Sequence, residues 1–498
     1  MLKVASCDSQ SAVYIAENAV YRVIQEGHED AVSSVLKSVS TLGFKGIIAT
    51  EVCTDAETLA ALMPSAQTLV LKHKKIEYIS YPHEWCASML KDASLFHLEL
   101  SQKLLPQELF LKDAHPWNIL FDKGRPIFVD FTSIVSKDSL FDEAYLESNK
   151  FYEESSDQVR LAFLVKEIFE RMYKPYFVMA LCGYAFGQRS RVMKAIETTT
   201  INASTSTISV RDSMPSFIGY RFHLVYSIIN KLFGLLKVRV QINNAMKRLT
   251  QRKEITAFNS EIHGIVSDIK VEVGTSAYSN YYKLKGEDDA WSYSETWNDK
   301  QKTVYNALNN NNNNTVLDVA CNTGWFAVLA EKLGKRVVAF DIDEGCIEAL
   351  YAQVKSEQLD ILPLVLNFTE MTQNRYSIVD GKIVLINAAQ RLCSDSVIAL
   401  GIIHHLALGV GLSFKQILDK LLPLCKEQLI IEFIDKDDEM IQGEPTFFPA
   451  FSKNRDLIAG YNLEEFKALI ETRGYDVLIE KSHPVTRSIL ICNKRLIA

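Results

Sequence analysis

One segment restricts the fold of this chain more than any other: TVLDVACNTGWFAVLAEKLGKRVVAFDID, residues 315–343. An apolar strand is predicted to end at Asp318, a loop of small residues follows, and a helix opens at Trp325. The next apolar strand ends at Asp341. Small residues allow the backbone to approach a ligand closely at the carboxyl edge of a sheet. An acidic side chain at the end of the second strand is suited to accept hydrogen bonds from both hydroxyls of a ribose.

The loop after the first strand argues against a dinucleotide, because it lacks GxGxxG and offers no seat for a pyrophosphate. It resembles the first motif of class I S-adenosylmethionine (SAM)-dependent methyltransferases, usually D-x-G-x-G-x-G. Ala320 and Asn322 stand at the first two glycine positions, and Gly324 is the third. The resemblance implies that SAM is the cofactor and that its methionine part is held by Asp318 and by the loop backbone at Ala320, Cys321, Asn322 and Gly324.

The resemblance extends over about residues 276–498 and implies further cofactor contacts. By this resemblance Asp341 holds the ribose and Ile342 packs on the adenine. Asn367 would hydrogen-bond the adenine amino group, and Phe368 would flank the ring. The alternation of apolar strands and amphipathic helices independently predicts a doubly wound α/β sheet covered on both faces, with two closing strands as a hairpin.

The segment DSVIALGIIHHLAL, residues 395–408, resembles the "HHL" segment of many small-molecule methyltransferases. A histidine beside the transferred methyl could take a proton from a hydroxyl nucleophile, since an imidazole pKa lies near neutrality. His404 and His405 are therefore the candidate catalytic residues. The alternative is that one of them caps the strand exit or packs under the sheet. A metal site is disfavoured, because adjacent histidines do not easily face one ion and no acidic cluster joins them.

The N-terminal half contains a second motif, LKDAHPWNILFDKGRPIFVDF, residues 111–131. Asp113, Asn118 and Asp130 have the spacing of the catalytic Asp, metal-binding Asn and metal-binding Asp of protein kinases and small-molecule phosphotransferases. If this site is active, Asp113 is catalytic, Asn118 and Asp130 bind Mg²⁺, and ATP is a second cofactor. Two strands within 11–25, a helix over 28–42 and a long helix over 85–105 follow a kinase order.

This kinase-like resemblance has clear departures. The chain has no glycine-rich phosphate loop and no V-A-I-K lysine, and Arg22 is the nearest basic residue on a strand. "DFT" replaces "DFG", and no A-P-E follows. The sequence therefore favours an α+β kinase-like domain that is degenerate and binds substrate or partner. A working phosphotransferase remains the alternative.

The length of 498 residues predicts more than one domain. We expect a kinase-like domain at 1–195, a helical linker region at 196–275 and the methyltransferase domain at 276–498. Nine scattered cysteines without a CxxC pair indicate reduced thiols in a cytoplasm. The net charge of -7 argues against a dedicated nucleic-acid partner, and no apolar stretch is long enough to span a bilayer. The Trp- and Tyr-rich segment 278–308 is either a lid or a packed entry helix.

The chain also resembles bacterial proteins that are called nodulation-protein-like class I methyltransferases. This likeness includes the segments SYPHEWCASMLKDASLFHLEL and LKDAHPWNILF. The preferred hypothesis is methyl transfer from SAM to a small-molecule or glycan acceptor, at oxygen or nitrogen. The alternatives are a bifunctional kinase–methyltransferase and a non-catalytic scaffold that binds SAM.

Overall fold

The computed structural model spans the whole chain and describes residues 1–4, 10–62, 68–142, 155–185, 189–199, 222–271, 273, 293–372, 387–442 and 455–495. The chain forms two compact units. The first contains the described residues up to Val273, and the second contains those from Tyr293 onward. Residues 278–292 of the aromatic segment 278–308 lie outside the described residues, so the lid hypothesis stays a prediction, as do the domain boundaries at 195 and 275.

The second unit is built on a seven-stranded sheet with the order β12-β11-β10-β13-β14-β16-β15. The strands are β10 (Thr315–Val319), β11 (Arg336–Asp341), β12 (Ile361–Val365), β13 (Ser394–Ala399), β14 (Cys425–Ile434), β15 (Tyr475–Lys481) and β16 (Arg487–Lys494). The first five strands of this order are parallel, and β16 runs antiparallel to both of its neighbours. The predicted α/β class is therefore confirmed, and the closing hairpin places the later strand inside the sheet.

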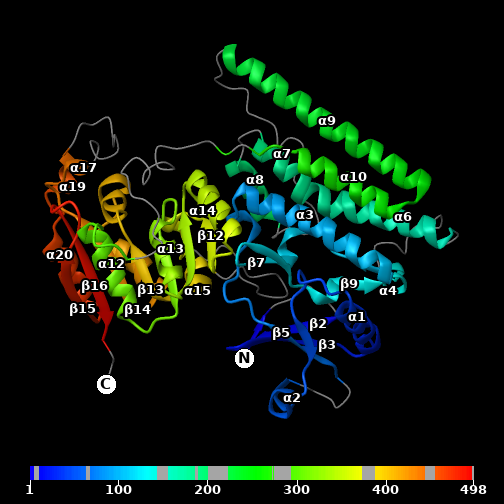
Figure 1. Cartoon of the computed structure of the whole chain (residues 1–498), viewed down its shortest axis with the longest axis horizontal. Coiled ribbons are helices and arrows are strands. Elements are labelled where there is room, and N and C mark those ends of the chain that lie inside the picture. The colour runs from blue at the N-terminus through cyan, green and yellow to red at the C-terminus, as the bar shows by residue number, and fades with distance from the viewer. Residues whose placement is uncertain are drawn as a thin grey trace. The chain divides into compact units, whose positions relative to one another are not determined.

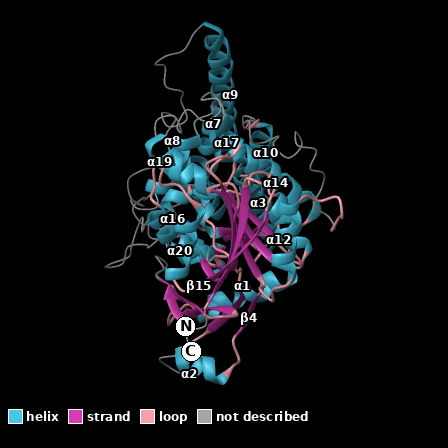
Figure 2. Ribbon diagram, turned by 90° about the vertical axis from the view of Figure 1, so that its left-hand side faces the viewer, coloured by secondary structure: helices cyan, strands magenta, loops and turns pink. Residues whose placement is uncertain are grey.

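Helices cover both faces of this sheet: α12 and α14 lie on one side of the strands, and α16 and α20 lie on the other (Figure 2). The principal helices are α12 (Asp299–Asn309), α13 (Trp325–Lys332), α14 (Glu344–Glu357), α16 (Phe414–Leu421) and α20 (Leu463–Thr472). Four short ones are α15 (Ala388–Leu392), α17 (Glu439–Gln442), α19 (Arg455–Ile458) and a π-helix at His405–Val410. Side chains cap the N-termini of several helices. The Asn298 side chain accepts a hydrogen bond from the backbone N–H of Gln301, and the Ser413 side chain accepts one from the backbone N–H of Gln416.

The strand order places a topological switch between β10 and β13, the second of which is labelled in Figure 1. From β10 the chain moves outward to β11 and β12 and then returns to the other side of β10 as β13. The connections at the carboxyl ends of β10 and β13 therefore diverge and leave a crevice. Ligands of open α/β sheets bind at this position.

The first unit begins with a five-stranded antiparallel sheet in the order β1-β2-β3-β5-β4. Its strands are β1 (Leu2–Val4), β2 (Ser11–Ile15), β3 (Ala19–Ile24), β4 (Thr50–Val52) and β5 (Val70–Lys74). The helices α1 (Glu29–Thr41) and α2 (Ala56–Leu62) accompany this sheet. The predicted strand pair within 11–25 and the helix within 28–42 are confirmed.

The rest of the first unit is mainly helical and begins with α3 (Ala87–Leu104), which confirms the predicted long helix. Two small antiparallel pairs follow, β6 (Leu109–Leu111) with β9 (Ile134–Ser136), and β7 (Ile119–Asp122) with β8 (Arg125–Phe128). The later helices are α4 (Lys137–Phe141), α6 (Asp157–Ile168), a π-helix at Phe169–Met179, α7 (Ala180–Ala185), α8 (Arg189–Thr199), α9 (Phe222–Arg252) and α10 (Ile255–Asp268).

The end of α10 is fixed to α3, because Lys91 donates to the carbonyls of Ser267 and Ile269. Gln102 of α3 likewise donates to the hydroxyl of Ser260 on α10. Among the described helices, none is both long and apolar enough to cross a membrane.

Candidate active site

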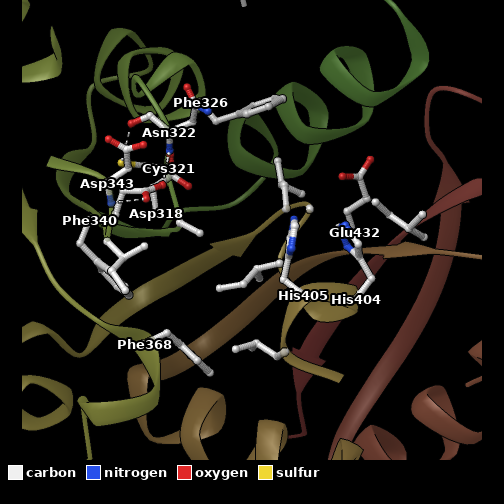
Figure 3. Close-up of a pocket in the computed structure, with 18 of the residues that line it drawn as sticks. Asp318, Cys321, Asn322, Phe326, Phe340, Asp343, Phe368, His404, His405 and Glu432 are labelled. Atoms are coloured by element: carbon white, nitrogen blue, oxygen red, sulfur yellow. Dashed lines mark hydrogen bonds between the residues drawn. The ribbon is translucent and has the colours of Figure 1, made fainter. Parts of the chain in front are cut away.

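A cavity of about 530 Å³ opens at the carboxyl ends of β10, β11, β13 and β14 (Figure 3). This volume lies in the usual range of small-molecule and cofactor sites. The cavity brings together the predicted residues Asp318, Ala320, Cys321, Asn322, Asp341, Ile342, Asn367, Phe368, His404 and His405. Of the residues predicted for this unit, Gly324 does not line it.

The loop between β10 and α13 has three residues in the left-handed region, at alternate positions. Ala320 has φ 56°, Asn322 has φ 53° and Gly324 has φ 84°. These are the three glycine positions of the resembled motif, so the backbone keeps the glycine conformation where alanine and asparagine replace it. Gly324 also packs closely, because a Cβ there would lie 2.5 Å from Cδ1 of Leu350. Its contribution is to shape the loop.

Asp341 connects the end of β11 to this loop. Its Oδ2 accepts from the backbone N–H of Asn322 at 2.9 Å, and its Oδ1 accepts from that of Asp343 at 2.9 Å. A carboxylate has about four acceptor positions, so each oxygen can still accept a further hydrogen bond. Asp341 therefore orients the loop and still has capacity for two ligand hydroxyls.

Asp318 is a buried acid at the base of the cavity, 3% exposed. Burial, reinforced by the nearby Asp341 carboxyl, raises the pKa of Asp318 to about 8. Among the described residues, none provides a hydrogen-bond donor to its Oδ2. A buried carboxyl oxygen without a donor is costly unless a ligand supplies one. The ammonium group of a methionine part is a donor of the right kind, so this residue fits SAM.

The predicted adenine contacts differ in their local structure. Ile342 is 69% exposed although it is apolar, which fits a surface that a planar ring would cover. Phe368 is buried at the cavity wall. The side-chain oxygen of Asn367 accepts from the backbone N–H and the hydroxyl of Thr369, so this side chain caps a 3-10 helix at Phe368–Glu370. Its contact with an adenine amino group stays a prediction.

His404 and His405 both line the cavity, with ring centroids 4.1 Å apart. Burial lowers the pKa of His405 to about 4 and holds that of His404 well below its ordinary value, where the neighbouring His405 adds to the effect. The expectation of an imidazole pKa near neutrality is therefore wrong for this site. Both rings are neutral at pH 7, and each is a weaker base than the sequence suggested. Their catalytic role stays a prediction.

The cavity also contains charged residues that sequence reasoning missed: Lys300, Glu432 and Arg487. Figure 3 shows Glu432 beside His404, across the cavity from Asp318 and Cys321. The sequence did contain a sign of Glu432: it is the single charged residue in the segment QLIIEFI of β14, and this whole segment is buried. A charge inside a buried strand is rare without a partner or a function.

The kinase-like residues of the first unit lie close together but are held by protein groups. Asp130 forms an ion pair with Arg22 of β3 at 3.0 Å. The Asp113 backbone N–H donates to the Ser133 hydroxyl at 3.1 Å, and the Asn118 amide lies 3.5 Å from the Asp113 carbonyl oxygen. The described residues contain no group of three His, Cys, Asp or Glu arranged to hold a metal ion.

No family model matches the chain. Ribosomal protein L11 methyltransferase of Thermotoga maritima is 39% identical over 72 residues, which cover 14% of this chain and 27% of that protein. Together with the parallel sheet, the left-handed loop and the two acidic strand ends, this similarity defines the class: the chain is a SAM-dependent methyltransferase. Over most of its length the chain is similar to the nodulation protein NoeA of Rhizobium meliloti (strain 1021), with 24% identity over 425 residues, 84% of this chain and 81% of that protein.

Two solved methyltransferase structures are more distant. Magnesium protoporphyrin IX methyltransferase (ChlM) from Synechocystis PCC 6803 with bound SAH is 14% identical and covers 43% of this chain and 97% of its own, with a TM-score of 0.27. The N-methyltransferase NodS from Bradyrhizobium japonicum WM9 is 12% identical and covers 39% and 94%, with a TM-score of 0.26. Similarity at this level says nothing of acceptor or mechanism.

Proposed function

We propose that the second unit transfers a methyl group from SAM to a small-molecule or glycan acceptor, at oxygen or nitrogen. The observation that carries this proposal is a single cavity with two chemically different ends. One end has the acidic residues Asp318 and Asp341, and the other has Glu432, which forms an ion pair with Lys300. The first end fits the cofactor, and the second is left for the acceptor.

Each cofactor-side residue has a stated task in this proposal. Asp318 binds the ammonium of the methionine part, and Asp341 binds the ribose hydroxyls. Ile342 and Phe368 cover the adenine faces. SAM, when bound, supplies an activated methyl group on a sulfonium. The protein contributes position and exclusion of water around the acceptor atom, which are large effects for a bimolecular transfer.

The test is calorimetry of SAM and S-adenosylhomocysteine (SAH) binding to the full chain. Asp341→Ala removes the ribose acceptor and two loop hydrogen bonds, so we expect a loss of about 2–3 kcal/mol in binding free energy. The matched control is Asp360→Ala, because Asp360 directly precedes β12. It therefore lies at the amino-terminal ends of the parallel strands, away from the cavity at their carboxyl ends. An unchanged affinity in Asp341→Ala, or no binding by the unmodified chain, would reject the proposal.

For the first unit we propose a degenerate kinase-like module that assists substrate or partner binding. The order of strands and helices supports the kinase-like part of this proposal. The Arg22–Asp130 ion pair supports degeneracy, because the guanidinium occupies the carboxylate that would bind a metal ion. A bifunctional kinase–methyltransferase and a SAM-binding scaffold are the competing hypotheses. Loss of methylated product in Asp113→Asn would favour the bifunctional enzyme. Binding of SAM without any methyl transfer would favour the scaffold.

A further inference from the structure

The charged end of the cavity contains an ion pair that stability alone does not explain. Nζ of Lys300 lies 2.8 Å from Oε2 of Glu432, whose side chain is 0% exposed. The second carboxylate oxygen accepts from the hydroxyl of Ser482 at 2.8 Å. Buried ion pairs cost desolvation, and apolar residues in their place are often as stable or more so. A buried pair that also lines a cavity is therefore a candidate for a direct role.

The position of Glu432 on β14 directs its carboxylate to the crevice beside β13. Gly401 follows β13 with φ 65°, and a Cβ there would come within 3.8 Å of Oε2 of Glu432. Gly401 therefore lies next to the Glu432 carboxylate at the exit of β13. Each oxygen of Glu432 is used by one protein donor, and a carboxylate has about four acceptor positions. Glu432 can still accept a hydrogen bond from a ligand.

The charges at this end of the cavity balance. Arg487 forms an ion pair with Asp438 at 3.0 Å, and both side chains are almost fully buried. The Asp438 carboxylate also accepts from the hydroxyl of Thr486. Two cations therefore face two anions, Lys300 with Glu432 and Arg487 with Asp438. A charged acceptor would have to displace one side chain of an ion pair and leave the other side chain without its counter-charge, which is unfavourable in a buried site.

The cavity wall near Glu432 also includes the imidazole rings of His404 and His405, and the apolar residues Val410, Ile434 and Met440 line the cavity as well. An acceptor therefore meets an apolar surface and, besides the two imidazole rings, a carboxylate with unused hydrogen-bonding capacity. A neutral hydroxyl compound matches both features, whereas an ammonium would compete with Lys300 and a phosphate would be repelled by Glu432. Sugars and glycosides combine hydroxyls with apolar C–H faces.

We propose that the acceptor is a neutral hydroxyl compound of the glycoside class and that Glu432 accepts the hydrogen of its nucleophilic hydroxyl, with Lys300 as the residue that positions the carboxylate. The inference rests on the proposed methyl transfer. The acceptor oxygen forms a bond to the methyl carbon while the carbon–sulfur bond breaks, and that electron pair stays on sulfur. The hydroxyl proton passes to Glu432 and from there to solvent. The products are a methyl ether, SAH and one proton.

The binding experiment uses the full chain saturated with SAH and three matched probes: methyl α-glucopyranoside, glucosamine and glucose 6-phosphate. Melting temperature and ligand-observed NMR are measured against probe concentration. We expect binding of the neutral glycoside and at least about 10-fold weaker binding of both charged sugars. Glu432→Ala should weaken glycoside binding by about 10-fold or more, while SAH affinity stays unchanged.

The matched control is Glu427→Gln, because Glu427 lies on the same strand with its side chain exposed. This variant should bind SAH and the glycoside as the unmodified chain does. Transfer of labelled methyl from SAM to the glycoside separates binding from proton acceptance. Glu432→Gln keeps an oxygen acceptor but not the base, so we expect binding within about 3-fold and transfer slower by about 100-fold.

Folding is controlled with the double variant Lys300→Met, Glu432→Leu, which removes both charges together. If it melts normally and binds SAH but not the glycoside, the proposal stands; if it binds the glycoside normally, the proposal is overturned. Tighter binding of either charged sugar, or no glycoside binding by the SAH-saturated chain, also overturns it. In these cases SAH binding is intact, so the proposed methyltransferase function survives. Absence of SAH binding would instead reject that function.

Discussion

Asp318 shows how one buried residue couples the cofactor site to pH. Its carboxyl pKa is raised from 3.8 to about 8, with burial as the largest cause. In the unfolded chain the group ionises at its ordinary pKa. The protonated form is therefore favoured by folding, and the stability associated with it is present at low pH and lost as the pH rises through about 4 to 8.

We expect the free energy of unfolding to depend on pH differently in Asp318→Asn, which has no carboxyl to ionise. Relative to this variant, the unmodified chain should lose stability on the order of a few kcal/mol between pH 5 and pH 8.5. Urea unfolding across that range measures the difference directly. The buried histidines act in the opposite sense below pH 6.5, but they are present in both proteins and cancel in the comparison. If the free energy of unfolding changed with pH in the same way in both proteins, the raised pKa of Asp318 would be contradicted.

At the scale of elements, the loop between β10 and α13 explains how a motif survives the loss of its glycines. The left-handed conformation at Ala320 and Asn322 costs about 1–2 kcal/mol for a residue with a Cβ, although asparagine tolerates it better. Hydrogen bonding to Asp341 and the packing of α13 hold the loop in place. Only Gly324 has no room for a side chain, because Leu350 of α14 lies against it.

We expect Gly324→Ala to lower the free energy of unfolding by about 2–4 kcal/mol and to weaken SAH binding, because it adds a clash with Leu350 to the cost of the left-handed backbone. Gly334→Ala is the matched control. Its φ of 79° is similar, but nothing lies within 4 Å of the added Cβ. This variant should lose only about 1–2 kcal/mol and bind SAH normally. Equal losses in both variants would show that the contact with Leu350 is not decisive.

The strand β3 sets the electrostatics of the kinase-like residues. Arg22 is 7% exposed, and its guanidinium donates to the hydroxyls of Ser11 and Thr132 as well as pairing with Asp130. A divalent cation at Asp130 would have to displace this guanidinium or share the carboxylate with it. The arrangement favours a fixed ion pair over a metal site.

We therefore expect ATP with Mg²⁺ or Mn²⁺ to leave the melting temperature of the chain within about 1 °C of its value without them, since the Arg22 guanidinium already pairs with the carboxylate that a cation would need to bridge to the triphosphate. Asp113→Asn should leave methyl transfer intact. The measurements are a thermal-shift titration and a methyl-transfer assay. Metal-dependent stabilisation by ATP, together with loss of product in Asp113→Asn, would instead support the bifunctional enzyme.

At the scale of the whole molecule, each unit has its own core. All seven strands of the larger sheet come from residues 315–494, and the sheet has no strand from the first unit. We expect a fragment of residues 276–498 to fold and to bind SAH within about 3-fold of the full chain, because domains with a separate core usually fold alone. Circular dichroism and calorimetry test this expectation. An unfolded fragment would show that the first unit is needed for the stability of the second.

The cofactor end of the site could be predicted from the sequence because each part of it is local. Asp341 ends β11, Asp318 lies one residue before the end of β10, and the loop between β10 and α13 follows at once. The acceptor end could not, since Lys300 and Glu432 are 132 residues apart and neither belongs to a motif. The low pKa values of His404 and His405 result from burial in the finished fold, which a pattern of adjacent histidines does not show.

The place of β16 between β14 and β15 has a consequence for biosynthesis. The ribosome delivers β10 to β13, with most of the residues proposed to bind the cofactor, well before β16 exists. Glu432 lies opposite Ile489 of β16, and Arg487 begins that strand. A nascent chain can thus complete the part of the sheet that is proposed to bind the cofactor while the other part still lacks β16, the strand between β14 and β15. The part of the cavity that is proposed to bind the acceptor is therefore completed last.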